Sequence, residues 1–149
     1  MFAKKRGLNR KAGPPVHEDL VERRFTATRA NQLWLTDITE HRTDEGKLYF
    51  CAIKDVYSNR IVGYSIDERM KASPAVAAIR NAICLRSPAG TAVHSDRGSQ
   101  FRSKAFIRML SNNNLIGSMG RVGACGDNAG MESFFALLQK NVLDRQRWT

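Results

Sequence analysis

Three apolar segments in the first half of the chain follow the pattern of a β-meander. Residues 32–40 are rich in β-branched and aromatic side chains, residues 47–56 are almost continuously apolar, and residues 60–67 resume the pattern. The polar segments 43–46 and 57–59 are short enough to be tight turns. Strands joined so closely are typical of an antiparallel arrangement, with residues 47–56 as a buried central strand.

Helical spacing follows the third predicted strand. Ser73 and Pro74 suit the N-cap and the first turn of a helix, on which Val76, Ile79 and Ile83 share one face. The rest of the chain predicts, in order, a short strand over residues 91–94, a helix over 103–112, a strand at 115–116 and a last helix over 128–143.

The resulting element order, βββαβαβα, predicts an α/β protein. Three antiparallel strands leading into crossover units give a central mixed five-stranded sheet flanked by helices, which is the arrangement of the ribonuclease H-like fold. We expect one such domain over residues 31–149, preceded by a basic N-terminal arm or linker over residues 1–30.

Charge makes a polyanionic partner plausible. The chain carries 24 lysines and arginines against 14 acidic residues, a net charge of +10, and residues 1–30 hold half of that excess. Residues 1–16 read as a flexible basic arm and residues 18–24 as a short helix, with order beginning near Asn31. The arm could bind phosphates or could be a plain linker.

Composition is that of an ordinary soluble protein, and we expect it in the cytoplasm. No apolar run approaches the ~20 residues that span a bilayer, and the basic N-terminus has no apolar stretch behind it. The three cysteines, Cys51, Cys84 and Cys125, are an odd number without a Cys-x-x-Cys pair, so we expect small buried side chains rather than disulfides. Cysteines and histidines show no zinc-ligand spacing.

Three carboxylates stand out as candidate metal ligands. Asp37 lies in the first predicted strand and Asp96 just after the fourth. Glu132 lies on the last predicted helix, separated from Asp96 by 35 intervening residues. Taken singly, each has an ordinary reading as a strand-end, turn or surface-helix acid. Together they would repel one another unless a divalent cation held them, and Mg²⁺ prefers such oxygen ligands.

Basic and polar residues near these acids are candidate DNA contacts, although each could equally be a solvated surface residue. Asn128 could hydrogen-bond the metal shell or a phosphate, or it could cap a helix. His94 could orient a neighbouring residue or be structural. Four glycines between residues 117 and 126 recur every third residue, which resembles a mobile lid loop or a plain connector. The candidate DNA contacts are Arg97, Arg102, Arg121, Asn128 and Lys140.

Three motifs carry a family resemblance. Residues 33–39 (LWLTDIT), 94–101 (HSDRGSQF) and 126–135 (GDNAGMESFF) resemble the integrase catalytic core of bacterial insertion-sequence transposases. They look most like the second reading frame product of the insertion-sequence-three family, and the likeness extends from Asn31 to Trp148. The Asp, Asp, 35 residues, Glu spacing is the hallmark of that family and of retroviral integrases.

The resemblance implies a DDE transposase that cleaves and transfers DNA strands. Asp37, Asp96 and Glu132 would hold two Mg²⁺ (or Mn²⁺) ions, one activating water or a DNA 3′-hydroxyl and the other stabilising the leaving oxygen. The implied partners are the element's terminal inverted repeats, target DNA, further copies of the chain in a synaptic complex and a helix-turn-helix protein from a partner frame. No membrane is implied.

The sequence departs from the family pattern at several positions. Gln139 stands where a lysine or arginine is usual, with Lys140 about 100° further round the helix. Gly120 replaces a common serine and Ala30 a usual proline. Relatives continue with further helices, so we expect a copy shortened at its C-terminus.

Two alternatives to a DDE transposase core remain. The chain could be a non-catalytic DNA-binding fragment of such a transposase. It could also be a metal-dependent nuclease that acts on RNA–DNA hybrids, although ribonuclease H proper uses a different set of carboxylates.

Overall fold

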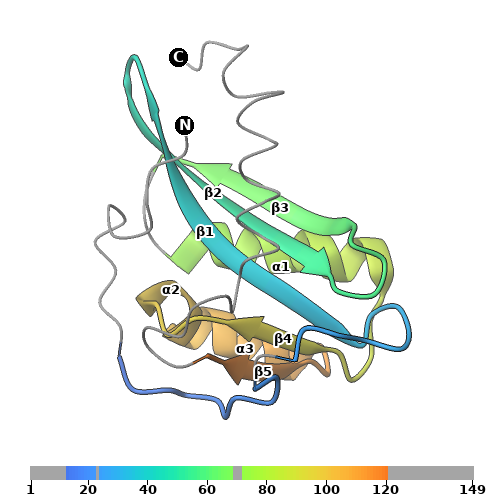
Figure 1. Cartoon of the computed structure of the whole chain (residues 1–149). Coiled ribbons are helices and arrows are strands. Elements are labelled where there is room, and N and C mark those ends of the chain that lie inside the picture. The colour runs from blue at the N-terminus through green and yellow to red at the C-terminus, as the bar shows by residue number, and fades with distance from the viewer. Residues whose placement is uncertain (1–12, 23, 69–71, 121–149) are drawn as a thin grey trace.

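A mixed five-stranded sheet forms the centre of the molecule (Figure 1). The computed structural model describes residues 13–22, 24–68 and 72–120. The first three strands form the expected antiparallel meander: β1 (Leu33–Thr43), β2 (Gly46–Asp55) and β3 (Ile61–Asp67). They are followed by α1 (Ala72–Arg86), β4 (Ala92–Ser95), α2 (Ser99–Arg102), α3 (Lys104–Asn112) and β5 (Ile116–Met119).

The strand order is β3-β2-β1-β4-β5, with β4 parallel to β1 and β5 parallel to β4. Placing the first strand at the centre, between its antiparallel partner and the first parallel strand, defines the ribonuclease H-like fold, so the predicted fold class is confirmed. The last predicted helix, over residues 128–143, lies outside the described residues.

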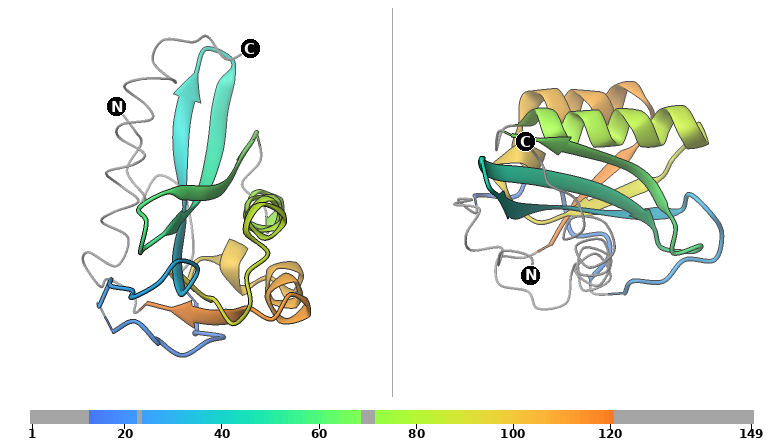
Figure 2. Two further views of the ribbon diagram at one scale, coloured as in Figure 1. Left: turned by 90° about the vertical axis from the view of Figure 1, so that its right-hand side faces the viewer. Right: turned by 90° about the horizontal axis from the view of Figure 1, so that it is seen from above.

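Helices α1 and α3 lie on one face of the sheet (Figure 2). The core between them and the sheet joins Trp34 and Ile38 of β1 to Ile79 of α1 and to Phe106 and Leu110 of α3, all buried. Trp34 is therefore a core residue, as the apolar pattern indicates. Within the described residues, no helix is long and apolar enough to cross a membrane.

A β-bulge fits β3 against α1. The register between β2 and β3 shifts at Ile53 and Lys54, so that Val62 is the extra residue of β3. Val62 is buried in the core, and a Cβ on Gly63 would lie 2.5 Å from the carbonyl oxygen of Ala78 in α1. Glycine at position 63 thus allows α1 to approach the sheet closely.

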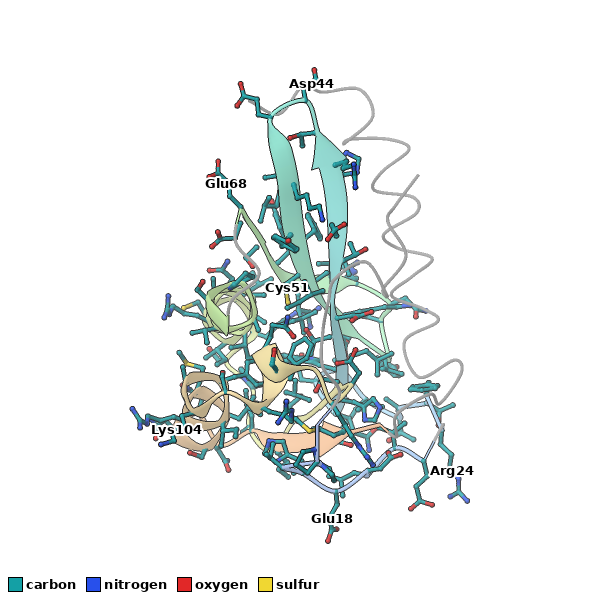
Figure 3. The ribbon with its side chains drawn as sticks, turned by 90° about the vertical axis from the view of Figure 1, so that its left-hand side faces the viewer. Glu18, Arg24, Asp44, Cys51, Glu68 and Lys104 are labelled. Atoms are coloured by element: carbon teal, nitrogen blue, oxygen red, sulfur yellow. The ribbon has the colours of Figure 1, made fainter. Side chains whose placement is uncertain are left out.

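The second face of the sheet, opposite α1 and α3, carries a smaller cluster of Leu35, Phe50 and Ala52. Side chains alternate between faces along a strand, so Asp37 lies on the same face as Leu35. At one end, the β1–β2 hairpin projects past the rest of the sheet, with Asp44 at its tip (Figure 3).

Three sequence-based expectations about helices need correction. α1 begins at Ala72, so Ser73 lies in its first turn instead of at the N-cap. Residues 99–102 form the short helix α2, which the turn-like composition of that segment concealed. The described residues between 18 and 24 form no helix, because the Asp19 carboxylate accepts hydrogen bonds from Val21 N and Glu22 N and closes a turn with a positive φ at Glu22.

Order also begins earlier than Asn31. Residues 13–22 run along β5, where Met119 N donates to Glu18 O (3.2 Å) and Leu20 N donates to Ser118 Oγ (2.9 Å). We call residues 13–22 the N-terminal strap. Gly13 N also donates to Arg97 O (3.3 Å), so the chain is already fixed at residue 13 and residues 13–16 are not part of a free arm.

Two smaller expectations also fail. Gly117, expected in a mobile glycine-rich stretch, is a β5 residue paired with Val93, and Gly120 N donates to Ser95 O at 2.9 Å. Cys51 is buried as expected, but Cys84 is exposed on α1 because it does not lie on the face that packs against the sheet.

Candidate active site

Asp37 lies in the interior of β1. Its side chain is fully buried, and Oδ1 accepts a hydrogen bond from the backbone N–H of Ile38 at 2.9 Å. Aspartate is disfavoured in strand interiors, and a buried carboxylate is costly unless it is partnered. The strand-end turn that could have explained this residue is therefore excluded.

Asp96 immediately follows β4 and is half-buried. Its Oδ1 accepts a hydrogen bond from Gly98 N at 2.8 Å, an Asx-type turn that leads into α2. Like Asp37, it uses one oxygen to accept a nearby backbone N–H. In both residues that bond restricts the orientation of the carboxylate group.

The register of the parallel strands brings the two aspartates to the same level. Leu35 of β1 is the partner of His94 in β4, and each aspartate stands two residues further along its own chain. A step of two residues keeps a side chain on the same face, and neighbouring strands lie about 4.8 Å apart. Asp37 in β1 and Asp96 just past the end of β4 thus follow this paired position on neighbouring strands.

The third predicted ligand, Glu132, lies outside the described residues, as do the candidate DNA contacts Arg121, Asn128 and Lys140. Among the described residues, no group of three or more histidine, cysteine or acidic side chains could hold a metal ion.

The two remaining candidate DNA contacts lie where the strap begins. The carbonyl oxygen of Arg97 accepts hydrogen bonds from Arg102 Nε (3.0 Å) and from Gly13 N (3.3 Å). A Cβ on Gly13 would collide with the Arg102 guanidinium, so the strap passes directly over this side chain. Arg97 and Arg102 are both half-buried near Asp96, and Gly13 at the start of the strap contacts both arginines.

His94 is buried on β4, two residues before Asp96. Its Nδ1 lies 2.9 Å from Ser118 Oγ on β5, and Phe25 meets its ring edge-to-face at 6.0 Å. These contacts give His94 a structural role, and its position before Asp96 is compatible with an orienting role as well. The part played by Ser118 and Phe25 was not apparent from sequence, because both lie far from His94 along the chain.

The strap holds His17 against β5. Its ring lies so close to Gly117 that a Cβ there would collide with it. Burial lowers the pKa of His17 below its usual value of 6.5, because desolvation disfavours the protonated ring.

Lys54 is a further residue of this face that local motifs did not indicate. It is half-buried on β2, and its register partners are Leu35 and Ile61, on the face that also carries Asp37. Alternation along β2 was the available signal, since it separates Lys54 from the core positions Cys51 and Ile53.

Comparison with known proteins places the chain in a family. The integrase core domain model matches residues 27–125, and the chain belongs to that family. The resemblance expected from the three motifs is thereby confirmed.

Curated relatives are insertion-element proteins of enteric bacteria. The chain is 44% identical over 128 residues to the transposase InsF for insertion sequence IS3A of Escherichia coli K12, which covers 85% of this chain and 44% of the relative. It is 41% identical over 135 residues to an uncharacterized 31 kDa protein of insertion element IS600 from Shigella sonnei, covering 90% and 50%. The chain spans about half the length of these relatives.

Two solved viral integrase structures share the fold. The HTLV-2 integrase catalytic core domain in complex with magnesium (dimeric form) matches 80% of this chain and 76% of its own, with a TM-score of 0.63 and 20% identity. The simian T-cell lymphotropic virus intasome, in complex with a PP2A regulatory subunit, matches 96% of this chain and 50% of its own, with a TM-score of 0.74 and 12% identity. These likenesses concern the fold.

Proposed function

We propose that this chain is the catalytic core of a DDE transposase, which cleaves the DNA strand at the end of an insertion sequence and transfers it to target DNA. The observation that supports the proposal is the register of β1 and β4, which pairs Leu35 with His94, two residues before Asp37 and Asp96, in a chain of the integrase core family. The 44% identity to an insertion-sequence transposase supports the same substrate class.

Asp37, Asp96 and Glu132 would hold two Mg²⁺ or Mn²⁺ ions. The donor set fits, because aspartate oxygens are the hard ligands such ions take, and Asp96 is only half-buried. When bound, the ions would supply Lewis-acid activation of the attacking and leaving oxygens of the phosphodiester.

The chain's own contribution is positioning. The hydrogen bonds from Ile38 N to Asp37 and from Gly98 N to Asp96 hold both carboxylates before any ligand arrives. Preorganised charges of this kind need no rearrangement during the reaction.

Arg97 and Arg102 would contact phosphates beside the carboxylates, and Arg121, Asn128 and Lys140 would add contacts from the rest of the chain. Guanidinium groups bind phosphate oxygens through paired hydrogen bonds. Relatives of this fold include a dimeric catalytic core and an intasome, which supports assembly of several copies on DNA. The division into an arm over residues 1–30 and a core over residues 31–149 is part of this proposal, as is action in the cytoplasm.

Substitution of the aspartates tests the proposal. Asp37→Asn and Asp96→Asn should each lower Mg²⁺-dependent cleavage and strand transfer of labelled terminal-repeat DNA by about a hundredfold or more, since metal stabilisation of the transition state is worth several kcal/mol. Thermal melting should confirm that both variants fold. Glu45→Gln in the exposed β1–β2 turn removes the same charge and should retain activity.

Unchanged cleavage by both aspartate variants would overturn the assignment. DNA binding by the unsubstituted chain, with no cleavage in either metal, would instead favour the non-catalytic DNA-binding fragment.

A further inference from the structure

An aromatic pair lies in line with the two aspartates on the second face of the sheet. Asp37 is the register partner of Ala52 in β2, and Ala52 is the partner of Tyr64 in β3. Register partners share a face, and two strand spacings separate Tyr64 from Asp37, about 10 Å. Asp37 and Ala52 are fully buried on this line, whereas Tyr64 at its far end is 56% exposed.

Tyr64 is held in place and yet accessible. Its ring stacks on Phe50 with centroids 5.6 Å apart and planes 7° from parallel. Phe50 is 4% exposed and Tyr64 is 56% exposed, so the buried ring supports the outer one. A tyrosine fixed in this way loses little conformational entropy when another flat ring stacks against it.

Lys54 adds a positive charge to the same face. It stands two residues from Ala52 along β2, which makes it a diagonal neighbour of Asp37, about 7–8 Å away between backbones. Its ammonium group makes no hydrogen bond or ion pair with any of the described residues. Lys54 has no anionic partner in the described part of the chain, and its register partners Leu35 and Ile61 are apolar. Its ammonium group is therefore suited to an anion from another molecule.

We propose that Lys54 and the Tyr64–Phe50 pair bind unpaired nucleotides of the DNA strand whose phosphodiester lies at Asp37 and Asp96. Tyr64 stacks on an unpaired base and Lys54 binds a backbone phosphate next to it. The proposal rests on the proposed function, because the carboxylate pair defines which strand is held. It adds a preference for DNA with a frayed or single-stranded end.

The combination of groups favours single-stranded DNA. Proteins that bind single strands combine positively charged side chains along the DNA backbone with aromatic rings on which bases stack. The bases of duplex DNA are already stacked on one another, so such a ring can bind only a base that has left the duplex. An apolar protein partner would not satisfy the Lys54 charge. The net charge of +10 further favours a polyanion.

Binding of the full chain to two DNA probes tests this assignment. One probe is a blunt duplex, and the other carries a single-stranded tail with 2-aminopurine, whose fluorescence falls on stacking. Ca²⁺ replaces Mg²⁺ as an oxygen-liganded cation. Tyr64→Ala should weaken binding of the tailed probe about tenfold and abolish the fluorescence change, whereas Tyr64→Phe should retain both.

Matched variants control for exposure and charge. Tyr57 in the β2–β3 turn is 55% exposed, so Tyr57→Ala removes an equally exposed ring and should bind the tailed probe normally. Lys54→Gln should reduce the slope of log affinity against log salt by about 0.7, the value for one contact with a single strand. Lys104→Gln, on the exposed surface of α3, should leave that slope unchanged.

Normal binding of the tailed probe by both Tyr64→Ala and Lys54→Gln would overturn the inference. So would a loss of self-association in Tyr64→Ala with DNA binding intact, because the aromatic pair would then face a second copy of the chain. Cleavage that depends on Asp96 while both variants bind normally would leave the proposed function standing without this inference. Selective loss of tailed-probe binding in these variants, when the unsubstituted chain never cleaves DNA, would support the inference but contradict the proposed function.

Discussion

At the scale of single residues, two glycines in the sheet differ in what surrounds them. A Cβ on Gly63 would meet the backbone of α1 at Ala78 and Ala82, whereas a Cβ on Gly117 would meet only the His17 ring. Backbone in a packed helix cannot withdraw, but a side chain on the strap can rotate away. The first glycine therefore sets how close a helix lies to the sheet, and the second sets only how closely the strap lies on β5.

We predict that Gly63→Ala destabilises the protein by about 1–3 kcal/mol, the usual cost of overpacking. Gly117→Ala should cost less, since His17 can move. Urea unfolding of the two variants and the unsubstituted chain measures both free energies. An equal loss of unfolding free energy in the two variants would show that α1 can shift away from the sheet as readily as the His17 side chain can rotate.

At the scale of elements, the N-terminal strap completes the edge of the sheet formed by β5. An exposed edge strand offers unpaired backbone groups to other chains, and covering segments prevent this. Residues 13–22 supply a hydrogen-bonded cover through Glu18 and Leu20, and the start of the strap reaches Arg97 beside Asp96. The strap thus links the β5 edge to the candidate active site.

Acid should loosen the strap through His17. Burial lowers its pKa in the folded protein, so the folded state resists protonation while the unfolded state takes up a proton near pH 6.5. The stabilisation is present above the unfolded pKa and is lost as pH falls through the folded pKa. Between about pH 7.5 and pH 5.5, His17→Gln should therefore lose less stability than the unsubstituted chain.

Unfolding free energies at both pH values measure this difference, and the other two histidines are common to both proteins. Hydrogen exchange at the amide of Leu20 should also accelerate in acid only when His17 is present. Parallel pH profiles for the two proteins would contradict the role given to His17.

At the scale of the whole molecule, positive charge is concentrated at the N-terminus. Residues 1–12 contain five lysines and arginines and no acidic residue, while the whole chain has a net charge of +10. Residue 12 is joined to Gly13, which is hydrogen-bonded to Arg97 beside Asp96. Half of the excess charge therefore precedes the segment that is fixed next to the carboxylates.

Replacing the lysines and arginines of residues 1–12 with serine should flatten the salt dependence of DNA binding. Each lost phosphate contact reduces the slope of log affinity against log salt by about 0.9 on duplex DNA. Titrations at several salt concentrations measure the slope, and the serine variant keeps the length of the chain. An unchanged slope would mean that this segment makes no phosphate contact.

The sequence by itself determined the meander and the fold class, and it assigned Asp37 to β1 and Asp96 to the segment after β4. Strand alternation and helical spacing depend only on neighbours a few residues away. The local pattern was therefore sufficient to place Asp37 within a strand and Asp96 just after one. The three motifs also identified the family, which the match of the integrase core domain model to residues 27–125 confirms.

Only the tertiary structure decided which distant residues meet. Leu20 and Ser118 are 98 positions apart, and no local periodicity indicates that the strap lies on β5. The line from Asp37 through Ala52 to Tyr64 likewise depends on the register of three strands. Register is fixed when the strands pack together, since a slip of one residue would turn every side chain to the other face.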